Sequence, residues 1–311
     1  MSLNHLIDHT ALDLNAKIED IETLVAEAKE YKFNSICIRP DWISSFASQY
    51  RCSAVVGFPE EVLFVTDNNS ISSVKNEIGA VHQGSKIIEA RQALLDGALE
   101  LDPVVEVRNL CINRDGEFLG DRVRKEITGY LFLLREFMKI YDPSIPGKFY
   151  EPSSETVKEG SVDQHYKLKP IFSCEILDTA ELELSVEILA ETINDFVENE
   201  IEEAKEKFPE LTNPQINLGF AYKNSTGFIK YAGNKPEQNP LKTTSPELIS
   251  NIASLLDKYD RNNLVKIKAA GGIRTPEDAL EIQNAAQGRL SHIGSSQGLA
   301  LCGQTTSTSG Y

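Results

Sequence analysis

The sequence predicts an α/β fold, a single (β/α)8 barrel with two insertions. Short apolar runs alternate with longer amphipathic segments from one end of the chain to the other, which is typical of parallel βαβ units. The length of 311 residues suits one such barrel with insertions. Eight strand candidates follow one another without a linker that would divide domains. We therefore expect one barrel domain over residues 1–303 and a polar, mobile tail over 304–311.

The N-terminal half supplies four of the strand candidates. Pro40 follows the second strand and Pro59 the third, and a residue without an N–H group ends a strand ladder. Asp102 lies within the fourth run and Pro103 comes next, which predicts a bulge or a strand end. We expect these strands over 5–12, 34–38, 53–58 and 98–107, with helices over 17–31, from 41, over 70–96 with a break at Gly84, and over 122–141.

The C-terminal half supplies the other four strands. Ser245-Pro246 and Thr275-Pro276 predict helix starts, because a hydroxyl side chain caps the first turn and proline fits its first position. Two stretches of polar residues with proline and glycine predict insertions after the fourth and sixth strands. The expected strands are 168–174, 216–222, 264–272 and 290–294, the helices are 179–207 and those starting after 245 and 275, and the insertions are 142–166 and 230–244.

Composition excludes several classes of partner. The formal charge of −16 argues against nucleic acid or an anionic membrane as a main partner. No run approaches the roughly 18–20 apolar residues of a membrane helix, and residues 1–15 lack the pattern of a secretory signal. The five cysteines are scattered and form no CxxC pair, so neither a disulfide framework nor a zinc site is indicated. We expect a cytoplasmic protein.

Two lysines lie near the ends of apolar strands, Lys223 and Lys268. Burial disfavours the ammonium form, and mutual repulsion favours loss of a proton from one of them. The resulting free amine could attack a carbonyl group. Asp8, Asp102 and Lys169 lie on or near other strands, and the C-terminal strand ends form the active face of such barrels. An ordinary salt bridge or turn cap is the alternative for each residue taken alone.

The last two βα loops predict a phosphate-binding site. Gly271-Gly272 and Gly294-Ser295-Ser296 offer backbone N–H groups before helices, and these loops often hold phosphate in such barrels. Arg274 could add a charged contact or could only begin a solvated helix. The histidines form no metal set, so no metal is expected. Cys37 is expected in the core, with a reactive thiol as the alternative if it faces the cavity.

Several motifs together resemble one known family. The chain is similar to deoxyribose-phosphate aldolase, a class I aldolase family with a (β/α)8 fold. The segments that carry the resemblance are IDHTAL (7–12), SICIRPDWI (35–43), VVGFP (55–59), ELDPVV (100–105), LKPIF (168–172), KNSTG (223–227), KAAGGIRTPEDA (268–279), IGSSQG (293–298) and the C-terminal Tyr311.

The resemblance implies a reaction and a set of site residues. Lys223 would form a Schiff base with 2-deoxy-D-ribose 5-phosphate, and Lys268 would lower the pKa of Lys223. Asp102, with a water, would move protons, and the products would be D-glyceraldehyde 3-phosphate and acetaldehyde, without metal or cofactor. Asp8 and Lys169 would belong to the same polar network, Tyr311 would fold back to assist proton transfer, and the phosphate would lie against Gly227, Gly271, Gly272, Arg274, Gly294, Ser295 and Ser296.

The chain departs from the family pattern around the phosphate. Phe228 replaces the second lysine of the usual Lys-Thr-Ser-Thr-Gly-Lys, Cys174-Glu175 replace a Thr-Gly pair, and Gln297 replaces a serine. Either phosphate affinity is reduced, or Arg274 or Lys230 compensates, or the substrate differs. A Schiff-base aldolase for another or unphosphorylated aldehyde and a non-catalytic barrel homologue are therefore the alternatives. A homodimer is the expected assembly from the resemblance.

Overall fold

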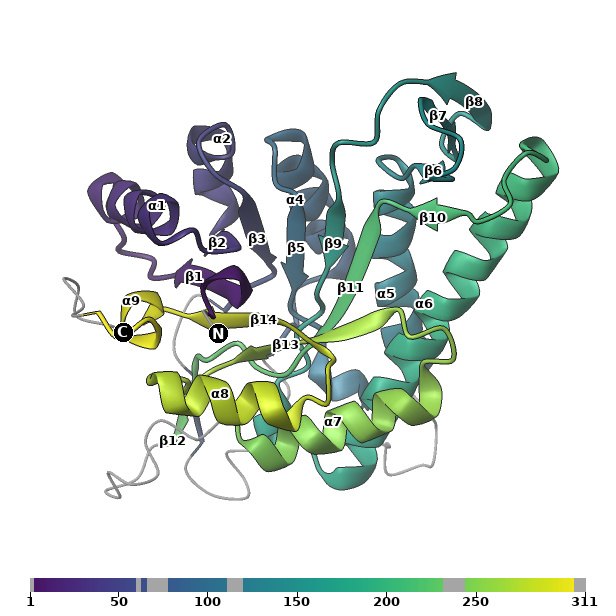
Figure 1. The fold of residues 1–311 in the computed structure, drawn as a ribbon. Coiled ribbons are helices and arrows are strands. Elements are labelled where there is room, and N and C mark those ends of the chain that lie inside the picture. The colour runs from purple at the N-terminus through teal and green to yellow at the C-terminus, as the bar shows by residue number, and fades with distance from the viewer. Residues whose placement is uncertain (1–2, 60–62, 66–77, 111–119, 232–243, 305–311) are drawn as a thin grey trace.

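Eight parallel strands close into a barrel in the computed structural model, which describes residues 3–59, 63–65, 78–110, 120–231 and 244–304 (Figure 1). Each strand pairs with the next one along the chain, and the last pairs with the first. The predicted (β/α)8 barrel is therefore confirmed. Its strands are β1 (Ile7–Ala11), β2 (Ser35–Ile38), β3 (Cys52–Val56), β5 (Glu100–Pro103), β9 (Tyr166–Leu168), β11 (Leu218–Lys223), β13 (Val265–Ala270) and β14 (Leu290–Ser295).

Helices cover the outside of the barrel, and their starts follow the predicted caps. The Ser245 hydroxyl accepts the Leu248 N–H at 3.1 Å. Thr275 and Asp278 form a reciprocal capping box at the start of α8. The helices are α1 (Ile18–Tyr31), α2 (Ile43–Phe46), α4 (Gln83–Leu95), α5 (Gly120–Arg135), α6 (Thr179–Lys207), α7 (Pro246–Tyr259), α8 (Pro276–Ala285) and α9 (Gly298–Leu301), with short 3₁₀ turns η1 (Asn4–Leu6), η2 (Pro40–Trp42), η3 (Val107–Leu110) and η4 (Cys174–Ile176).

Several boundaries differ from the sequence prediction, and the larger differences include those of the fifth barrel strand, α5 and α4. The fifth barrel strand is β9, which ends at Leu168 rather than running to residue 174, because Pro170 has no N–H for the ladder. Beyond it, Ile171 makes isolated bridges to the neighbouring strands. Helix α5 ends at Arg135, six residues before the predicted end at 141. Helix α4 begins at Gln83, so Gly84 lies in its first turn and does not break it.

The first insertion builds a small antiparallel sheet beside the barrel (Figure 1). The sheet order is β10 (Gln215–Ile216), β6 (Ile140–Tyr141), β7 (Lys148–Glu151) and β8 (Thr156–Glu159), so β6 pairs with β10 and with β7, and β7 pairs with β8. Strands β8 and β10 lead directly into β9 and β11, so this sheet lies at the N-terminal ends of the barrel strands. That end of a (β/α)8 barrel serves stability rather than chemistry.

At the opposite end of the barrel, two loops meet. Strand β4 (Leu63–Val65) follows β3, strand β12 (Ile229–Tyr231) follows β11, and the two pair in parallel. Most of the second insertion, residues 232–243, lies outside the described residues, and so do residues 305–311 of the tail.

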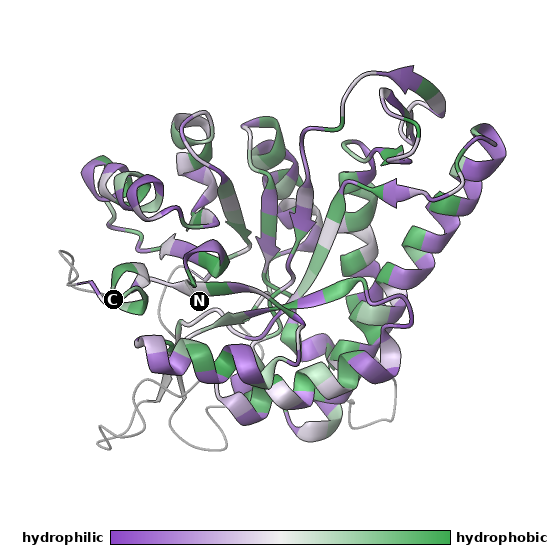
Figure 2. Cartoon of the chain, viewed as in Figure 1, coloured by the Kyte–Doolittle hydropathy of each residue, from purple (hydrophilic) through white to green (hydrophobic). Residues whose placement is uncertain are grey.

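The apolar core lies between the barrel and its helices. Figure 2 shows largely apolar strands, and hydrophilic residues alternating with apolar ones along the long helices α6 and α7. Leu101 and Ile267 of the strands, and Leu189 and Ile252 of these helices, are fully buried. Among the described residues, no helix is both long enough and apolar enough to cross a bilayer.

Gly79 supports the loop after β5, and its replacement should be costly. Its φ is +69°, and an added Cβ would lie 2.3 Å from the carbonyl oxygen of Val105. We expect Gly79→Ala to lower the free energy of unfolding by more than about 3 kcal/mol, measured by urea denaturation. The matched control is Gly147→Ala, with a φ of +81° and no atom within 4 Å. The control should lose only about 1–2 kcal/mol, and equal losses would contradict the contact.

Candidate active site

The register of the barrel brings Lys223 and Lys268 together. Strands β11 and β13 pair in parallel, and the two lysines are direct partners in that pairing. Side chains two residues apart point to the same side of a strand, so Glu100 and Asp102 both face the barrel interior from β5. Five of the predicted residues, Lys223, Lys268, Asp102, Asp8 and Lys169, therefore meet inside the barrel, and each is at least 97% buried.

The Asp102 carboxylate is the centre of this cluster. Its Oδ2 accepts hydrogen bonds from Lys223 Nζ at 2.8 Å and from Lys268 Nζ at 2.7 Å. Its Oδ1 accepts the Ser53 hydroxyl at 2.9 Å and forms an ion pair with Lys169 Nζ at 3.2 Å. Lys223 of β11, Lys268 of β13 and Lys169, which directly follows β9, thus all contact one carboxylate.

Asp8 forms the second bridge between the lysines. Its Oδ2 accepts from Lys268 Nζ at 2.7 Å and from Lys169 Nζ at 3.0 Å. Its Oδ1 accepts the Ser35 hydroxyl at 2.7 Å and the Asn34 amide at 2.9 Å. Lys268 and Lys169 therefore each contact both aspartates, whereas Lys223 pairs with Asp102 alone among the described carboxylates.

The electrostatics separate Lys223 from the other two lysines. Burial would lower the pKa of Lys268 and of Lys169, but the aspartates around them raise both above the usual 10.5. For Lys223, burial and the positive charge of Lys268 prevail over Asp102, and its pKa falls below 10.5. Burial also opposes the charged form of Asp102, yet the lysines hold its pKa well below 3.8. Lys223 is thus the lysine of this cluster that most readily becomes a free amine.

Cys37 faces the same cluster from β2. Its Sγ lies 3.8 Å from Asp102 Oδ2 and 3.9 Å from Lys268 Nζ. Burial raises the pKa of the Cys37 thiol, so the thiolate needed for nucleophilic attack is disfavoured. The sequence analysis gave a reactive thiol as the alternative if Cys37 faces the cavity. Cys37 does face the charged cluster, but the raised pKa of its thiol favours a structural role.

Glu100 forms further ion pairs inside the barrel, and the sequence analysis did not identify this residue. Glu100 accepts a hydrogen bond from Lys169, and its Oε1 forms ion pairs with Lys167 Nζ at 2.9 Å and Arg51 Nε at 3.1 Å. Burial favours the neutral acid, but these cations lower the pKa of Glu100 to about 2. The sequence did contain a signal for Glu100, because it lies two residues before Asp102 and both side chains therefore point to the same side of the strand.

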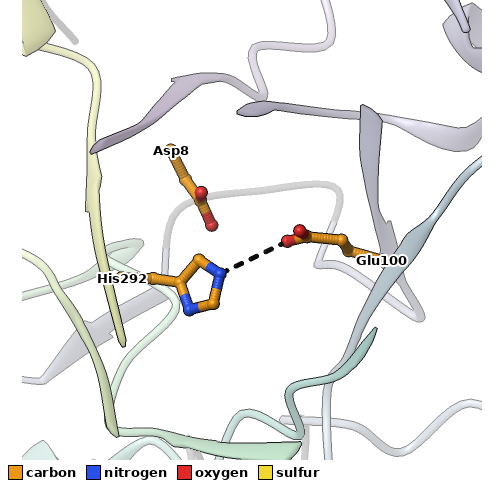
Figure 3. Close-up of side chains that lie close together, drawn as sticks. All are labelled: Asp8, Glu100 and His292. Carbon is orange, nitrogen blue, oxygen red and sulfur yellow. Dashed lines mark ion pairs between the residues drawn. The ribbon is translucent and has the colours of Figure 1, made fainter. Parts of the chain in front are cut away.

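Asp8, Glu100 and His292 point toward one another, as a metal-binding set would (Figure 3). However, the Lys169 ammonium lies 3.0 Å from Asp8 Oδ2 and also binds Glu100. Burial lowers the pKa of His292 to about 3, so the ring is neutral, and its Nε2 lies 2.7 Å from Lys167 Nζ. Lysine ammonium groups therefore supply the positive charge that a cation would bring to these three side chains.

The predicted phosphate loops form a rim above the cluster. A Cβ on Gly227 would lie 3.8 Å from Gly271 Cα, so the loops after β11 and β13 are adjacent. Gly227, Gly271 and Gly272 all have positive φ, between 74° and 96°. Asn224 joins the same loops, because its side chain accepts the Ala270 N–H at 2.9 Å.

The other predicted phosphate residues lie on β14 or beside it. A Cβ on Gly294 would lie 3.2 Å from Lys268 Cε, so the missing side chain there also makes room for the lysine. The Ser295 hydroxyl donates to the Ile273 carbonyl at 3.2 Å and accepts the Gln297 N–H at 3.0 Å. Ser296 is in the turn that follows. Arg274 is exposed.

Phe228, which stands where the family motif has its second lysine, makes an aromatic contact. Its ring meets Phe58 edge to face, with centroids 4.6 Å apart. The Arg39 guanidinium lies over Phe58, 5.6 Å from the ring centroid. The side chain of Lys230 and the whole of Tyr311 lie outside the described residues.

Comparison with known proteins identifies similar aldolases. Deoxyribose-phosphate aldolase of Mycoplasma mobile is 30% identical over 154 residues, which are 45% of this chain and 63% of the relative. That of Bacillus cereus is 34% identical over 132 residues, 41% of this chain and 49% of the relative. That of Caldicellulosiruptor saccharolyticus is 28% identical over 300 residues, 95% of this chain and 94% of the relative. The resemblance to deoxyribose-phosphate aldolases is confirmed.

Solved structures show the same fold. Deoxyribose phosphate aldolase from Aeropyrum pernix has a TM-score of 0.56 at 21% identity, covering 97% of this chain and 89% of the other. An aldolase called QR15 has a TM-score of 0.60 at 21% identity, covering 97% and 95%. No protein-family model matches the chain. The two relatives named first are covered over less than two thirds of their own length.

Removal of Lys169 should destabilise the barrel. Lys169→Met leaves Asp8 and Glu100 with one cation fewer in a site that excludes water. Breaking such a buried pair costs about 3–5 kcal/mol, and we expect this loss in the free energy of unfolding by urea denaturation. The control Lys266→Met changes a partly exposed lysine of β13 and should stay within about 0.5 kcal/mol. An equally stable Lys169→Met protein would show that the cluster contributes nothing to stability.

Proposed function

We propose that this protein is a class I aldolase that cleaves 2-deoxy-D-ribose 5-phosphate reversibly to D-glyceraldehyde 3-phosphate and acetaldehyde. The observation that carries the proposal is the difference between Lys223 and Lys268. These residues are partners on adjacent strands, and only Lys223 has a lowered pKa. The relatives named deoxyribose-phosphate aldolase support the choice of reaction.

Schiff-base formation uses the free amine of Lys223. Its Nζ attacks the aldehyde carbon C1, and loss of water from the carbinolamine gives an iminium ion. The Lys268 ammonium keeps Lys223 deprotonated and remains charged itself, because Asp8 and Asp102 both hold it. Asp102, 2.8 Å from Lys223 Nζ, is placed to relay protons through a water during the dehydration.

Carbon–carbon cleavage then follows from the iminium ion. A base removes the proton of the C3 hydroxyl, the C2–C3 bond breaks, and its electrons enter the enamine on Lys223. D-glyceraldehyde 3-phosphate leaves, the enamine takes a proton at C2, and water releases acetaldehyde from the lysine. The iminium nitrogen is the electron sink throughout. We propose that the Gly271 amide faces the phosphate, that the Gly227 loop lies beside it, and that Tyr311 assists proton transfer.

Borohydride trapping tests the nucleophile. Incubation with 2-deoxyribose 5-phosphate and borohydride should add the reduced adduct to a peptide containing Lys223, seen by mass spectrometry. Lys223→Leu should lose the adduct completely, because the other two lysines that pair with Asp102 have raised pKa values and stay protonated. Lys266→Met, which removes a partly exposed lysine two residues before Lys268 on β13, should keep it. An adduct that persists in Lys223→Leu would refute the assignment.

The pH dependence tests the role of Lys268. Its charge lowers the pKa of Lys223, and it shares Asp102 with Lys223. Lys268→Met removes the repulsion and leaves Asp102 to Lys223, so both effects raise the pKa of Lys223. The free amine then forms only at higher pH, and we expect the rising limb of the trapping rate to move up by at least about one pH unit. A midpoint that stays in place or moves to lower pH would contradict this role.

A further inference from the structure

The segment after β9 carries two buried polar atoms without a partner among the described residues. They are Ser173 Oγ and Glu175 Oε2. The segment lies directly against the strand that carries Lys223. Its backbone is fixed there, because the Phe172 N–H donates to the Lys223 carbonyl at 3.0 Å and the Cys174 N–H donates to the Asn224 carbonyl at 2.7 Å. Both unpaired atoms therefore belong to a segment whose backbone is hydrogen-bonded to the end of β11.

Ser173 adopts a backbone conformation that is unusual for a residue with a side chain. Its φ is +48° and its ψ is +56°, and the residue is fully buried. A left-handed non-glycine residue is strained, and an unpaired buried hydroxyl adds a further cost. Such costs gather at ligand-binding positions, where the ligand supplies the missing partner. The strain and the unpaired atoms lie in the same three residues.

Glu175 reaches toward the glycine-lined rim. Its Oε1 accepts the Ser225 hydroxyl at 2.9 Å, and the Ser225 oxygen accepts the Gly227 N–H at 2.8 Å. The Gly227 loop lies against Gly271, so the carboxyl group is linked to the place proposed for the substrate phosphate. Burial raises the pKa of Glu175 to about 7, and no ion pair joins it to a cation in the described part of the chain.

Among the described residues, no ion pair offsets a negative charge on Glu175. Phe228 is packed on Phe58, Arg274 is exposed, and the Arg39 guanidinium over Phe58 donates to the Leu12 and Pro59 carbonyls. A phosphate dianion at the rim would therefore meet the Glu175 carboxyl while no cation in the described part of the chain is paired with that carboxyl. An uncharged hydroxyl at the same place could instead donate a hydrogen bond to Glu175 Oε2.

We propose that Glu175 is a specificity-determining residue that accepts a hydrogen bond from the terminal hydroxyl of an unphosphorylated 2-deoxyaldose and opposes a phosphate ester there. The inference rests on the proposed aldol cleavage and refines its substrate class. The active site then turns over the free sugar as well as the phosphorylated one. Glu175 sets the ratio between them.

The test compares kcat/KM of the full chain for 2-deoxyribose 5-phosphate and for 2-deoxyribose. Glu175→Gln keeps the shape of the side chain and removes the charge, so it should raise the phosphorylated-to-free ratio about tenfold, mainly through KM. Glu175→Ala removes the acceptor and should lower kcat/KM for the free sugar about tenfold. The matched control Glu277→Gln makes the same charge change in the exposed first turn of α8 and should leave the ratio unchanged.

Two further measurements distinguish failure of this inference from failure of the proposed function. Inorganic phosphate should inhibit Glu175→Gln about tenfold more tightly than the parent protein, which measures binding without turnover. Borohydride trapping on Lys223 in each variant reports an intact imine site. Trapping with an unchanged ratio and unchanged phosphate inhibition overturns the inference and leaves the aldolase standing. Absence of trapping with either sugar in the parent protein overturns the proposed function, and the inference with it.

Discussion

The Asp102 carboxylate holds three lysine ammonium groups within 3.2 Å in the middle of the barrel, and the other polar contacts depend on this arrangement. Moving ions out of water costs several kcal/mol each, and only close, complete pairing offsets that cost. Asp8 and Glu100 complete the pairing from β1 and β5. The barrel interior can therefore be charged rather than apolar, provided that every member keeps its partners.

The same arrangement decides which lysine can react. Lys268 lies between two carboxylates, whereas Lys223 shares one carboxylate with it. The field of the two aspartates therefore keeps the proton on Lys268. Burial then acts on Lys223 with too little compensation, and its pKa falls below 10.5, which favours the free amine. Stability and nucleophilicity thus arise from one distribution of charge.

Local patterns in the sequence were sufficient for much of the fold and for part of the site. The lysine pair was predictable, because an apolar strand leaves few positions for a lysine and adjacent parallel strands place equivalent ends together. The caps at Ser245 and Thr275 were predictable for the same local reason. The sheet of β6, β7, β8 and β10 was not, since β10 pairs with a strand far back in the chain. The roles of Glu100 and Ser173 were not predicted, because they depend on three-dimensional neighbours rather than on spacing in the sequence.

The two ends of the site differ in how strongly their residues are tied to one another. Apart from Lys223, each charged residue of the cluster has at least two charged partners, so a single change there removes part of the pairing of a buried charge. At the rim, Phe228 packs on Phe58, and Glu175 makes one described side-chain hydrogen bond, to Ser225. Under the proposed function, a change at such positions would alter the fit of the distal end of the substrate without disturbing the Lys223 amine. The geometry would then let the chemistry stay fixed while the preference for phosphate varies, which is how we interpret the departures at Phe228 and Glu175.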